Sequence, residues 1–301
     1  MFTISLDQAS QESLRRIGSK ALQLARMMEL DVGVPGGFVV TAEALDRFIA
    51  VNGLLIEGTW SDYEERLLQA EIPEEIGREV AMAYEQLLKS AEVPDNAVAV
   101  RSSSSAEDLA AASFAGQYET ILNVTDLPHV LGSLKRCWAS LFSARVREYA
   151  AQKCINWNMN DLPMGVLVQL MVAADVSGVL FSMNPVTQNS DEIVINASYG
   201  LGEAVVSGLV TPDTYFIGKS DRRIRKELGL KELKVVAGAI ETMELETTEE
   251  EQCRFCLEEE QIGDLVEQTL KLEKYFGHPV DLEFAMKNGK MYILQARPVT
   301  T

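Results

Sequence analysis

The stretch AVAVRSSSSAEDLAAASFAGQ, residues 97–117, joins a short alternating strand to a serine-rich loop. Val98 and Val100 alternate with small residues, which is typical of a strand, and Arg101 stands at its end. Arginine offers a rigid fork of N–H donors, while serine hydroxyls and loop amides can line an anion cradle. The segment therefore favours two interpretations, a polyphosphate site or a solvated turn beside an incidental arginine.

The composition is that of a globular protein with an acidic surface. The chain has 301 residues, of which 47% are apolar, and this length allows one large domain or two smaller ones. A net charge of −18 argues against a nucleic-acid partner, although a nucleotide needs only a local basic pocket. Because neither a signal-peptide core nor a membrane-spanning run is visible, we expect a cytoplasmic protein that does not bind membranes.

Secondary-structure signals change character along the chain. Helical spacing dominates the first half and includes one long helix from 126 to about 151, with Trp138 on its buried face. Strand-like runs dominate the second half, except for residues 241–260, where nine glutamates predict a solvated, mobile segment. The pattern predicts an α+β protein with a helix-rich lobe over 1–185, a strand-rich lobe over 186–301 and a cleft between them.

The two strands nearest the C-terminus carry polar side chains at alternating positions. Asp281 and Glu283 share one face of the first strand, and Gln295 and Arg297 follow in the second. A carboxylate and an amide oxygen on adjacent strands suit Mg²⁺, and an arginine suits a phosphate. An exposed sheet face with outward polar residues would show the same alternation, so periodicity alone leaves both interpretations open.

The spacing of these residues makes a prediction about register. A two-residue turn at Asn288-Gly289 without irregularity pairs Glu283 with Leu294, which places Glu283 and Gln295 on opposite faces. Only an odd loop or a bulge pairs Glu283 with Gln295. We predict that odd register, because only it lets both side chains reach one metal ion.

Two further segments suit a phosphate ligand. Lys20, in the sequence GSK, comes just inside a predicted helix N-terminus, where backbone amides and the helix dipole favour an anion. Glu203 follows the glycine-rich turn that begins at Gly200 and allows close backbone approach. A surface lysine and an ordinary turn are the alternative interpretations.

Together these runs resemble the nucleotide-binding domain of the pyruvate phosphate dikinase and phosphoenolpyruvate synthase family, which includes rifampin phosphotransferase. The matching runs span nearly the whole chain: GSKALQL, VPGGFVVT, AVRSSSSAEDLAAASFAGQYETILNV, CWASLFSARVREY, QLMVAADVSGVLFSMNP, ASYGLGEAVVSGLVTPD, LGLKELKVV, GHPVDLEFA and YILQARPVT. SGVLFSMNPVT and RPVTT are more similar to rifampin phosphotransferase than to phosphoenolpyruvate synthase. The resemblance implies an ATP-grasp fold that holds ATP between two lobes.

The resemblance also implies roles for individual residues. Lys20, Arg101 and Arg297 would meet the phosphates and act in catalysis, and Glu283 and Gln295 would bind Mg²⁺. The remaining nucleotide contacts would come from the adenine segment Gln169, Leu170, Met171 and Val172, from the phosphate-covering loop residues Ser103, Ser104, Gly116 and Gln117, and from Glu203 and Lys231.

The family reaction implies a division of labour. ATP gives its β-phosphoryl group to a histidine on a swivelling domain, with AMP and phosphate as products overall, and the histidine passes phosphate to pyruvate or an antibiotic-like hydroxyl. We expect neither the swivelling domain nor an acceptor domain within residues 1–301, so both would come from elsewhere. A stand-alone ATP-grasp ligase that activates a carboxylate and releases ADP is the main alternative, and a regulatory nucleotide-binding protein is a third.

Overall fold

The computed structural model forms two compact units. It describes residues 1–54, 59–90, 97–105, 108–109, 112–113, 117–152, 163–238 and 241–299. Unit 1 comprises Met1–Glu29 and Gly36–Met171, and unit 2 comprises Leu30–Pro35 and Val172–Thr301. The division at residue 171 precedes the boundary expected near 185. Helices combine with antiparallel sheets, so the predicted α+β class is confirmed.

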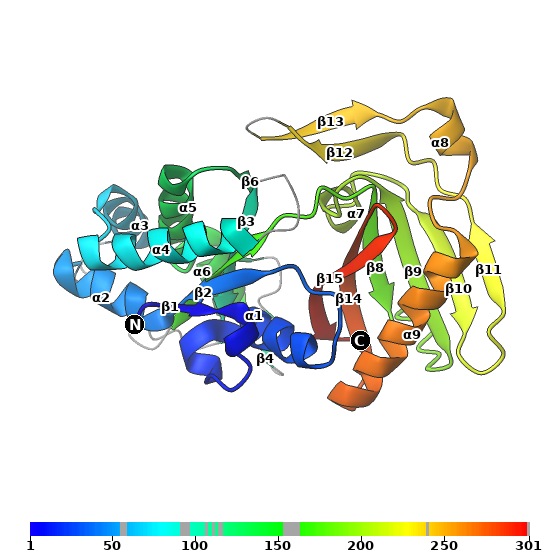
Figure 1. Ribbon diagram of the computed structural model, residues 1–301, viewed down its shortest axis with the longest axis horizontal. Helices are drawn as coiled ribbons and strands as arrows, with labels where there is room; N and C mark the ends of the chain where they lie inside the picture. The colour runs from blue at the N-terminus through cyan, green and yellow to red at the C-terminus, as the bar shows by residue number, and fades with distance from the viewer. Residues whose placement is uncertain are drawn as a thin grey trace. The chain divides into compact units, whose positions relative to one another are not determined.

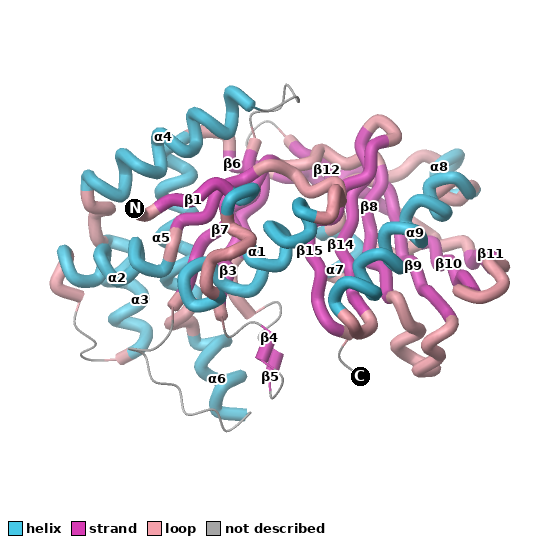
Figure 2. The backbone as a smooth tube through the Cα atoms, turned by 60° about the horizontal axis from the view of Figure 1, so that its bottom comes forward, coloured by secondary structure: helices cyan, strands magenta, loops and turns pink. Residues whose placement is uncertain are grey.

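Unit 1 is built on a five-stranded sheet in the order β1-β2-β7-β3-β6, with antiparallel neighbours throughout (Figures 1 and 2). Its elements are β1 (Thr3–Ser5), η1 (Leu6–Gln8), α1 (Leu14–Glu29), β2 (Gly37–Val40), α2 (Ala42–Val51), α3 (Trp60–Gln69), α4 (Glu74–Ser90), β3 (Val98–Ser104), β4 (Asp108–Leu109), β5 (Ala112–Ser113), β6 (Thr120–Val124), α5 (Leu127–Ser140), α6 (Ala144–Gln152) and β7 (Met164–Leu170). Within the described residues, strands β4 and β5 pair only with each other.

The core of unit 1 lies between the sheet and helices α2 to α6. Val98 and Val100 of β3 enter it together with Phe48 and Trp138. The rings of Phe48 and Trp138 are 5.1 Å apart, and Trp138 is fully buried, which confirms its predicted place in the core. Because successive strand residues face opposite sides, Arg101 of β3 lies on the other face from the two valines, and α1 packs against β3 and β7.

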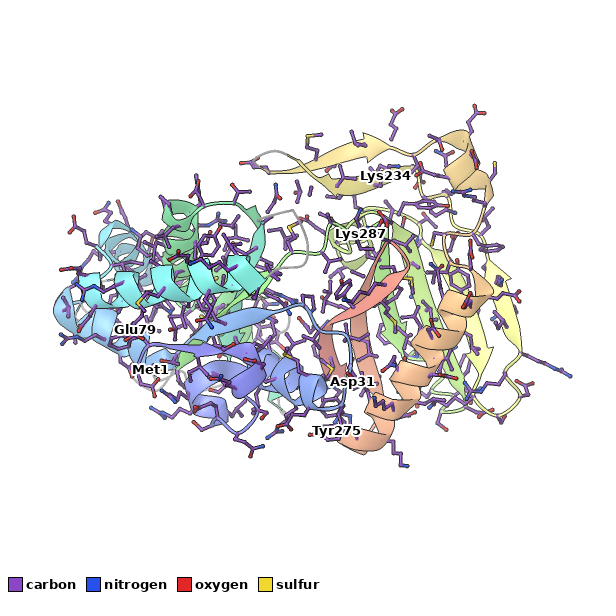
Figure 3. All side chains as sticks on the ribbon, in the orientation of Figure 1. Met1, Asp31, Glu79, Lys234, Tyr275 and Lys287 are labelled. Atoms are coloured by element: carbon purple, nitrogen blue, oxygen red, sulfur yellow. The ribbon has the colours of Figure 1, made fainter. Side chains whose placement is uncertain are left out.

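The first strand is fixed through its backbone. The carboxylate of Glu79 in α4 accepts hydrogen bonds from the N–H groups of Phe2, at 2.6 Å, and Thr3, at 3.2 Å. Figure 3 labels Glu79 close to the first residue of the chain. These contacts satisfy donors at the edge of the sheet, where β1 has a neighbour on one side only.

The prediction of one long helix from 126 to about 151 is wrong, because the chain forms two helices there. α5 ends at Ser140 and α6 begins at Ala144. Oγ of Ser143 accepts a hydrogen bond from the N–H of Val146 at 3.3 Å and so caps α6. Helical periodicity continues across the break, which hid it in the sequence.

Unit 2 is built on a six-stranded sheet in the order β11-β10-β9-β8-β14-β15. Its elements are β8 (Val176–Phe181), β9 (Glu192–Tyr199), α7 (Glu203–Val206), β10 (Asp213–Gly218), β11 (Ile224–Glu227), β12 (Leu233–Ala237), β13 (Thr242–Glu246), α8 (Glu249–Cys253), α9 (Glu259–Phe276), β14 (Val280–Lys287) and β15 (Lys290–Pro298). α9 crosses one face of the sheet and contacts β14 (Figure 1). None of the helices in the described ranges has both the length and the hydropathy needed to cross a bilayer.

The glutamate-rich segment 241–260 has regular structure that its composition did not predict. β13 pairs with β12 in a separate hairpin. Thr248 and Glu251 form a capping box at α8, in which each side chain accepts a hydrogen bond from the other residue's backbone N–H. The Thr-x-x-Glu spacing was a usable signal, but the high glutamate content obscured it.

Candidate functional site

Lys20 lies in α1 close to the point where this helix meets β3. Gly18 interrupts α1 with φ at 77°, and helical backbone resumes after it. A Cβ at Gly18 would lie 1.9 Å from the carbonyl oxygen of Ser103, so this close approach requires glycine. The buried Lys20 ammonium donates to the carbonyl oxygen of Ser102 at 2.8 Å. The predicted position of Lys20 just inside a helix N-terminus is therefore confirmed.

Arg101 and Gln169 lie on the same face of the unit 1 sheet. Ala99 pairs with Gln169 and Arg101 pairs with Leu167, which makes the two polar side chains diagonal neighbours on β3 and β7. The Arg101 guanidinium donates to Oε1 of Gln169 at 3.3 Å, and both side chains are buried. The register thus brings two of the predicted residues into direct contact.

Three of the four serines in the opening motif, Ser102 to Ser104, belong to β3 and not to a loop. Ser103 and Ser104 are buried at the end of this strand. Oγ of Ser103 accepts a hydrogen bond from the N–H of Ala21 at 3.1 Å, so this hydroxyl fixes α1. Gln117, the last residue of the motif, is half-buried, and Gly116 lies outside the described residues. The phosphate-covering role of Ser103, Ser104, Gly116 and Gln117 stays a prediction.

The predicted adenine segment spans the connection between the units. Gln169 and Leu170 end β7, Met171 is the last residue of unit 1, and Val172 belongs to unit 2. The N–H of Leu170 donates to the carbonyl oxygen of Gly36 at 2.8 Å. Gly36 is also the residue at which the chain re-enters unit 1. The two points at which the chain crosses between the units, at Gly36 and after Met171, are therefore joined by this hydrogen bond.

In unit 2, the hairpin of β14 and β15 has the predicted odd register. Asn288 and Gly289 form a two-residue turn with φ at 51° and 76°, the positive angles that a tight hairpin needs. Phe284 pairs with Ile293, but the next pair is Glu283 with Gln295, so Leu294 is an extra residue in a β-bulge. The bulge confirms the predicted register and places Glu283 and Gln295 directly opposite each other.

Arg297 and Asp281 pair two positions further along this hairpin, on the same face, and complete a polar cluster. Arg297 contacts Oδ2 of Asp281 and Oε1 of Glu283, each at 3.4 Å. Burial raises the pKa of Asp281 to about 6; the Arg297 charge opposes this shift and the negative charge of Glu283 adds to it. Oδ1 of Asp281 and Nε of Arg297 are buried without hydrogen-bond partners among the described residues. Unsatisfied buried polar atoms indicate a place for a ligand.

Asp281 has no role in the sequence-based prediction, although its alternation with Glu283 was visible. Two carboxylates and the amide of Gln295 offer oxygen ligands of the type that a hard divalent cation prefers. Among the described residues, no group of three or more histidine, cysteine, aspartate or glutamate side chains could hold a metal ion. A cation here would therefore be held by the Gln295 amide together with oxygens from a molecule bound with the cation or from water.

Lys231 and Glu203 do not join this cluster. Lys231 is fully buried, and its ammonium contacts Oδ1 of Asp213 at 2.6 Å and the carbonyl oxygen of Gly229 at 3.0 Å. Asp213 begins β10, which is separated from β14 by β9 and β8. Glu203 is exposed at the first position of α7. The Lys231 ammonium thus fills a structural ion pair in this conformation.

The sequence as a whole settles the family. Residues 14–301 match the family described as pyruvate phosphate dikinase, AMP/ATP-binding domain. The chain belongs to this family. Its mixed helical and antiparallel architecture agrees with the ATP-grasp fold of pyruvate phosphate dikinase AMP/ATP-binding domains, as the resemblance implied.

Curated relatives of this AMP/ATP-binding domain are much longer than the chain. An uncharacterized phosphotransferase of Bacillus subtilis, YvkC, is 42% identical over 100% of this chain and 35% of its own length. A probable phosphoenolpyruvate synthase of Methanocaldococcus jannaschii is 35% identical over 100% of this chain and 27% of its length. Rifampicin phosphotransferase of Bacillus cereus is 36% identical, again over the whole chain and 36% of its length. The chain therefore spans about a third of these relatives.

Proposed function

We propose that this chain binds MgATP and serves as the ATP-binding half of a dikinase-type phosphotransferase. The β-phosphoryl group of ATP would pass to a histidine on a separate swivelling domain or subunit, with AMP and phosphate as products overall. The acceptor is inferred from the names of relatives, a phosphoenolpyruvate synthase and a rifampicin phosphotransferase, and would be pyruvate or an antibiotic-like hydroxyl.

The bulged pair Glu283–Gln295 carries this proposal. A regular hairpin would satisfy the same hydrogen-bond ladder, yet it would send one of these side chains to the opposite face. The irregularity instead gathers both side chains with Asp281 and Arg297, at a cost to the ladder. A binding requirement explains that arrangement better than stability does.

Each residue group has a specific task in the proposed reaction. Lys20 and Arg101, two buried cations at β3, would hold and neutralise phosphate oxygens. Glu283, Gln295 and Asp281 would hold Mg²⁺, which supplies charge neutralisation along the triphosphate when bound. Arg297 would exchange its long carboxylate contacts for a terminal phosphate. Gln169 would orient Arg101 through their hydrogen bond.

Calorimetric titration with MgATP tests the binding half of the proposal. We expect binding that EDTA weakens strongly, and a loss of roughly 100-fold or more in affinity for Lys20→Met and Glu283→Gln, since each removes a charge-assisted contact. Lys274→Met, at an exposed position of α9, is the matched control and should change the affinity less than about twofold. Equal binding by all variants would refute the site.

Nucleotide product analysis tests the transfer half. The chain is incubated with MgATP and an isolated phosphohistidine swivelling domain of a dikinase, and the nucleotides are separated. AMP together with a phosphorylated histidine supports the proposal. ADP release, which a carboxylate-activating ATP-grasp enzyme would produce, contradicts it, and so does intact ATP in the presence of the partner.

A further inference from the structure

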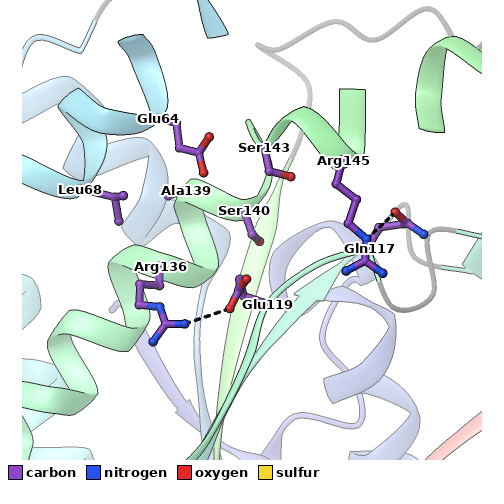
Figure 4. A pocket seen from close by; sticks show the side chains of 9 residues that line it. All are labelled: Glu64, Leu68, Gln117, Glu119, Arg136, Ala139, Ser140, Ser143 and Arg145. Atoms are coloured by element: carbon purple, nitrogen blue, oxygen red, sulfur yellow. Dashed lines mark hydrogen bonds and ion pairs between the residues drawn. The ribbon is translucent and has the colours of Figure 1, made fainter. Parts of the chain in front are cut away.

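A polar pocket lies on unit 1, among α3, α5, α6 and the segment that precedes β6. Its volume is about 230 Å³, and it is lined by Glu64, Leu68, Gln117, Glu119, Arg136, Ala139, Ser140, Ser143 and Arg145 (Figure 4). Of the residues assigned to nucleotide binding, only Gln117 lines it. Pockets for drug-sized ligands have volumes of roughly 300–1,000 Å³, so this one suits a smaller molecule.

One guanidinium and one carboxylate in the pocket have no partner of opposite charge among the described residues. Arg136 and Glu119 pair with each other at 3.2 Å. Arg145 donates from Nε to the neutral amide oxygen of Gln117 at 3.1 Å, and it forms no ion pair within the described part of the chain. The carboxylate of Glu64 has neither a hydrogen bond nor an ion pair with any described residue, and Figure 4 shows it pointing toward the pocket.

The environment of Glu64 disfavours its negative charge in the absence of a ligand. Burial raises the pKa of Glu64, and the charge of Glu119 adds to this effect. The positive charge of a bound cationic group would oppose this shift. On another side of the pocket, the terminal nitrogens of Arg145 offer the parallel donors that bind a carboxylate in a bidentate manner.

We propose that this pocket binds a small zwitterion of the amino-acid class, with its carboxylate on Arg145 and its ammonium at Glu64. A simple anion would face the uncompensated carboxylate of Glu64, and a simple cation would face Arg145. Leu68 and Ala139 supply a short apolar wall for the carbon atoms between the two charges. Oγ of Ser140 donates to the carbonyl oxygen of Cys137, which leaves its lone pairs to accept from an ammonium group.

Binding is tested without nucleotide, so the outcome is independent of the function proposed above. The probes are glycine, β-alanine and γ-aminobutyrate, which separate the two charges by increasing distances. Acetate and methylammonium carry one charge each and serve as ligand controls at matched ionic strength. We expect one zwitterion to bind at least about tenfold more tightly than either single-charge probe, as calorimetry or chemical-shift titration would measure.

Paired variants connect that binding to the pocket. Glu64→Gln and Arg145→Gln should each abolish the preference for the zwitterion. Glu65→Gln and Arg147→Gln change exposed neighbours outside the lining and should preserve it. Acetate binding as tightly as the best zwitterion would overturn the proposal in favour of a plain anion site. No binding of any zwitterion at millimolar concentration, by a chain with wild-type circular dichroism, would overturn it outright.

Discussion

Replacing Asp281 by asparagine measures the cost of the buried carboxyl in the ligand-binding cluster. Burial raises the pKa of Asp281 from 3.8 to about 6. The folded protein thus holds this proton more tightly than the unfolded chain, and stability falls as the pH rises between these two values. One pKa unit corresponds to about 1.4 kcal/mol, so the ionised carboxylate costs the ligand-free protein about 3 kcal/mol at pH 8.

We therefore expect Asp281→Asn to stabilise the ligand-free protein at pH 8 by up to about 3 kcal/mol, and by roughly half of that at pH 5. Urea unfolding at the two pH values measures this difference. With MgATP at 100 times its dissociation constant, the advantage of the variant at pH 8 should nearly vanish, because such a ligand adds about 2.7 kcal/mol to the wild type and little to the variant.

Asp264→Asn provides the control, since it removes an exposed carboxylate from α9 and should change stability by less than about 0.5 kcal/mol. A variant Asp281→Asn that is less stable than the wild type at pH 8 would refute the reasoning. A gain that is the same at pH 5 and pH 8 would show that the effect does not arise from the ionisation of this carboxyl.

Three further predictions concern the Lys231 ion pair, two cysteines and Gly18. Lys231→Met should destabilise the protein by about 3–5 kcal/mol in urea unfolding, because it leaves Asp213 buried without its ion-pair partner. The double variant Lys231→Met/Asp213→Leu should recover part of this loss, and equal losses for the two variants would contradict a structural ion pair. Iodoacetamide at pH 8 should label the exposed Cys253 and spare Cys137, whose pKa burial raises to about 12, as peptide mass spectrometry would report. Gly18→Ala should lower the free energy of unfolding by more than about 1–2 kcal/mol and weaken MgATP binding, because a Cβ there collides with β3. No change in either urea unfolding or calorimetric titration with MgATP would exclude the close approach.

The hairpin register was predictable because two independent requirements met there. A tight turn at Asn288-Gly289 fixes the ladder from one end, and the need for Glu283 and Gln295 to share a face fixes it from the other. Only a bulge satisfies both. The burial of Oδ1 of Asp281 without a hydrogen-bond partner was not predictable in the same way, because it depends on packing from several strands.

Helix ends and isolated hairpins were harder to predict. The break after Ser140 leaves the hydrophobic periodicity intact, so only the cap at Ser143 reveals it. The pairing of β12 with β13 depends on contacts between strands, which composition does not report. For Lys231 the sequence indicates a cation but cannot indicate its partner, since Asp213 lies in strand β10 and meets Lys231 only through folding.

The extra residue in β15 can be recognised in related sequences from whether the number of residues between the two ligands is odd or even. An odd number of residues separates Glu283 from Gln295. In an unbulged hairpin with a two-residue turn, residues that pair are always separated by an even number. A homologous chain with an odd count must therefore hold a bulge or an odd turn between its two ligands. A chain with an even count can align the same pair without either, so counting letters tests whether the geometry is kept.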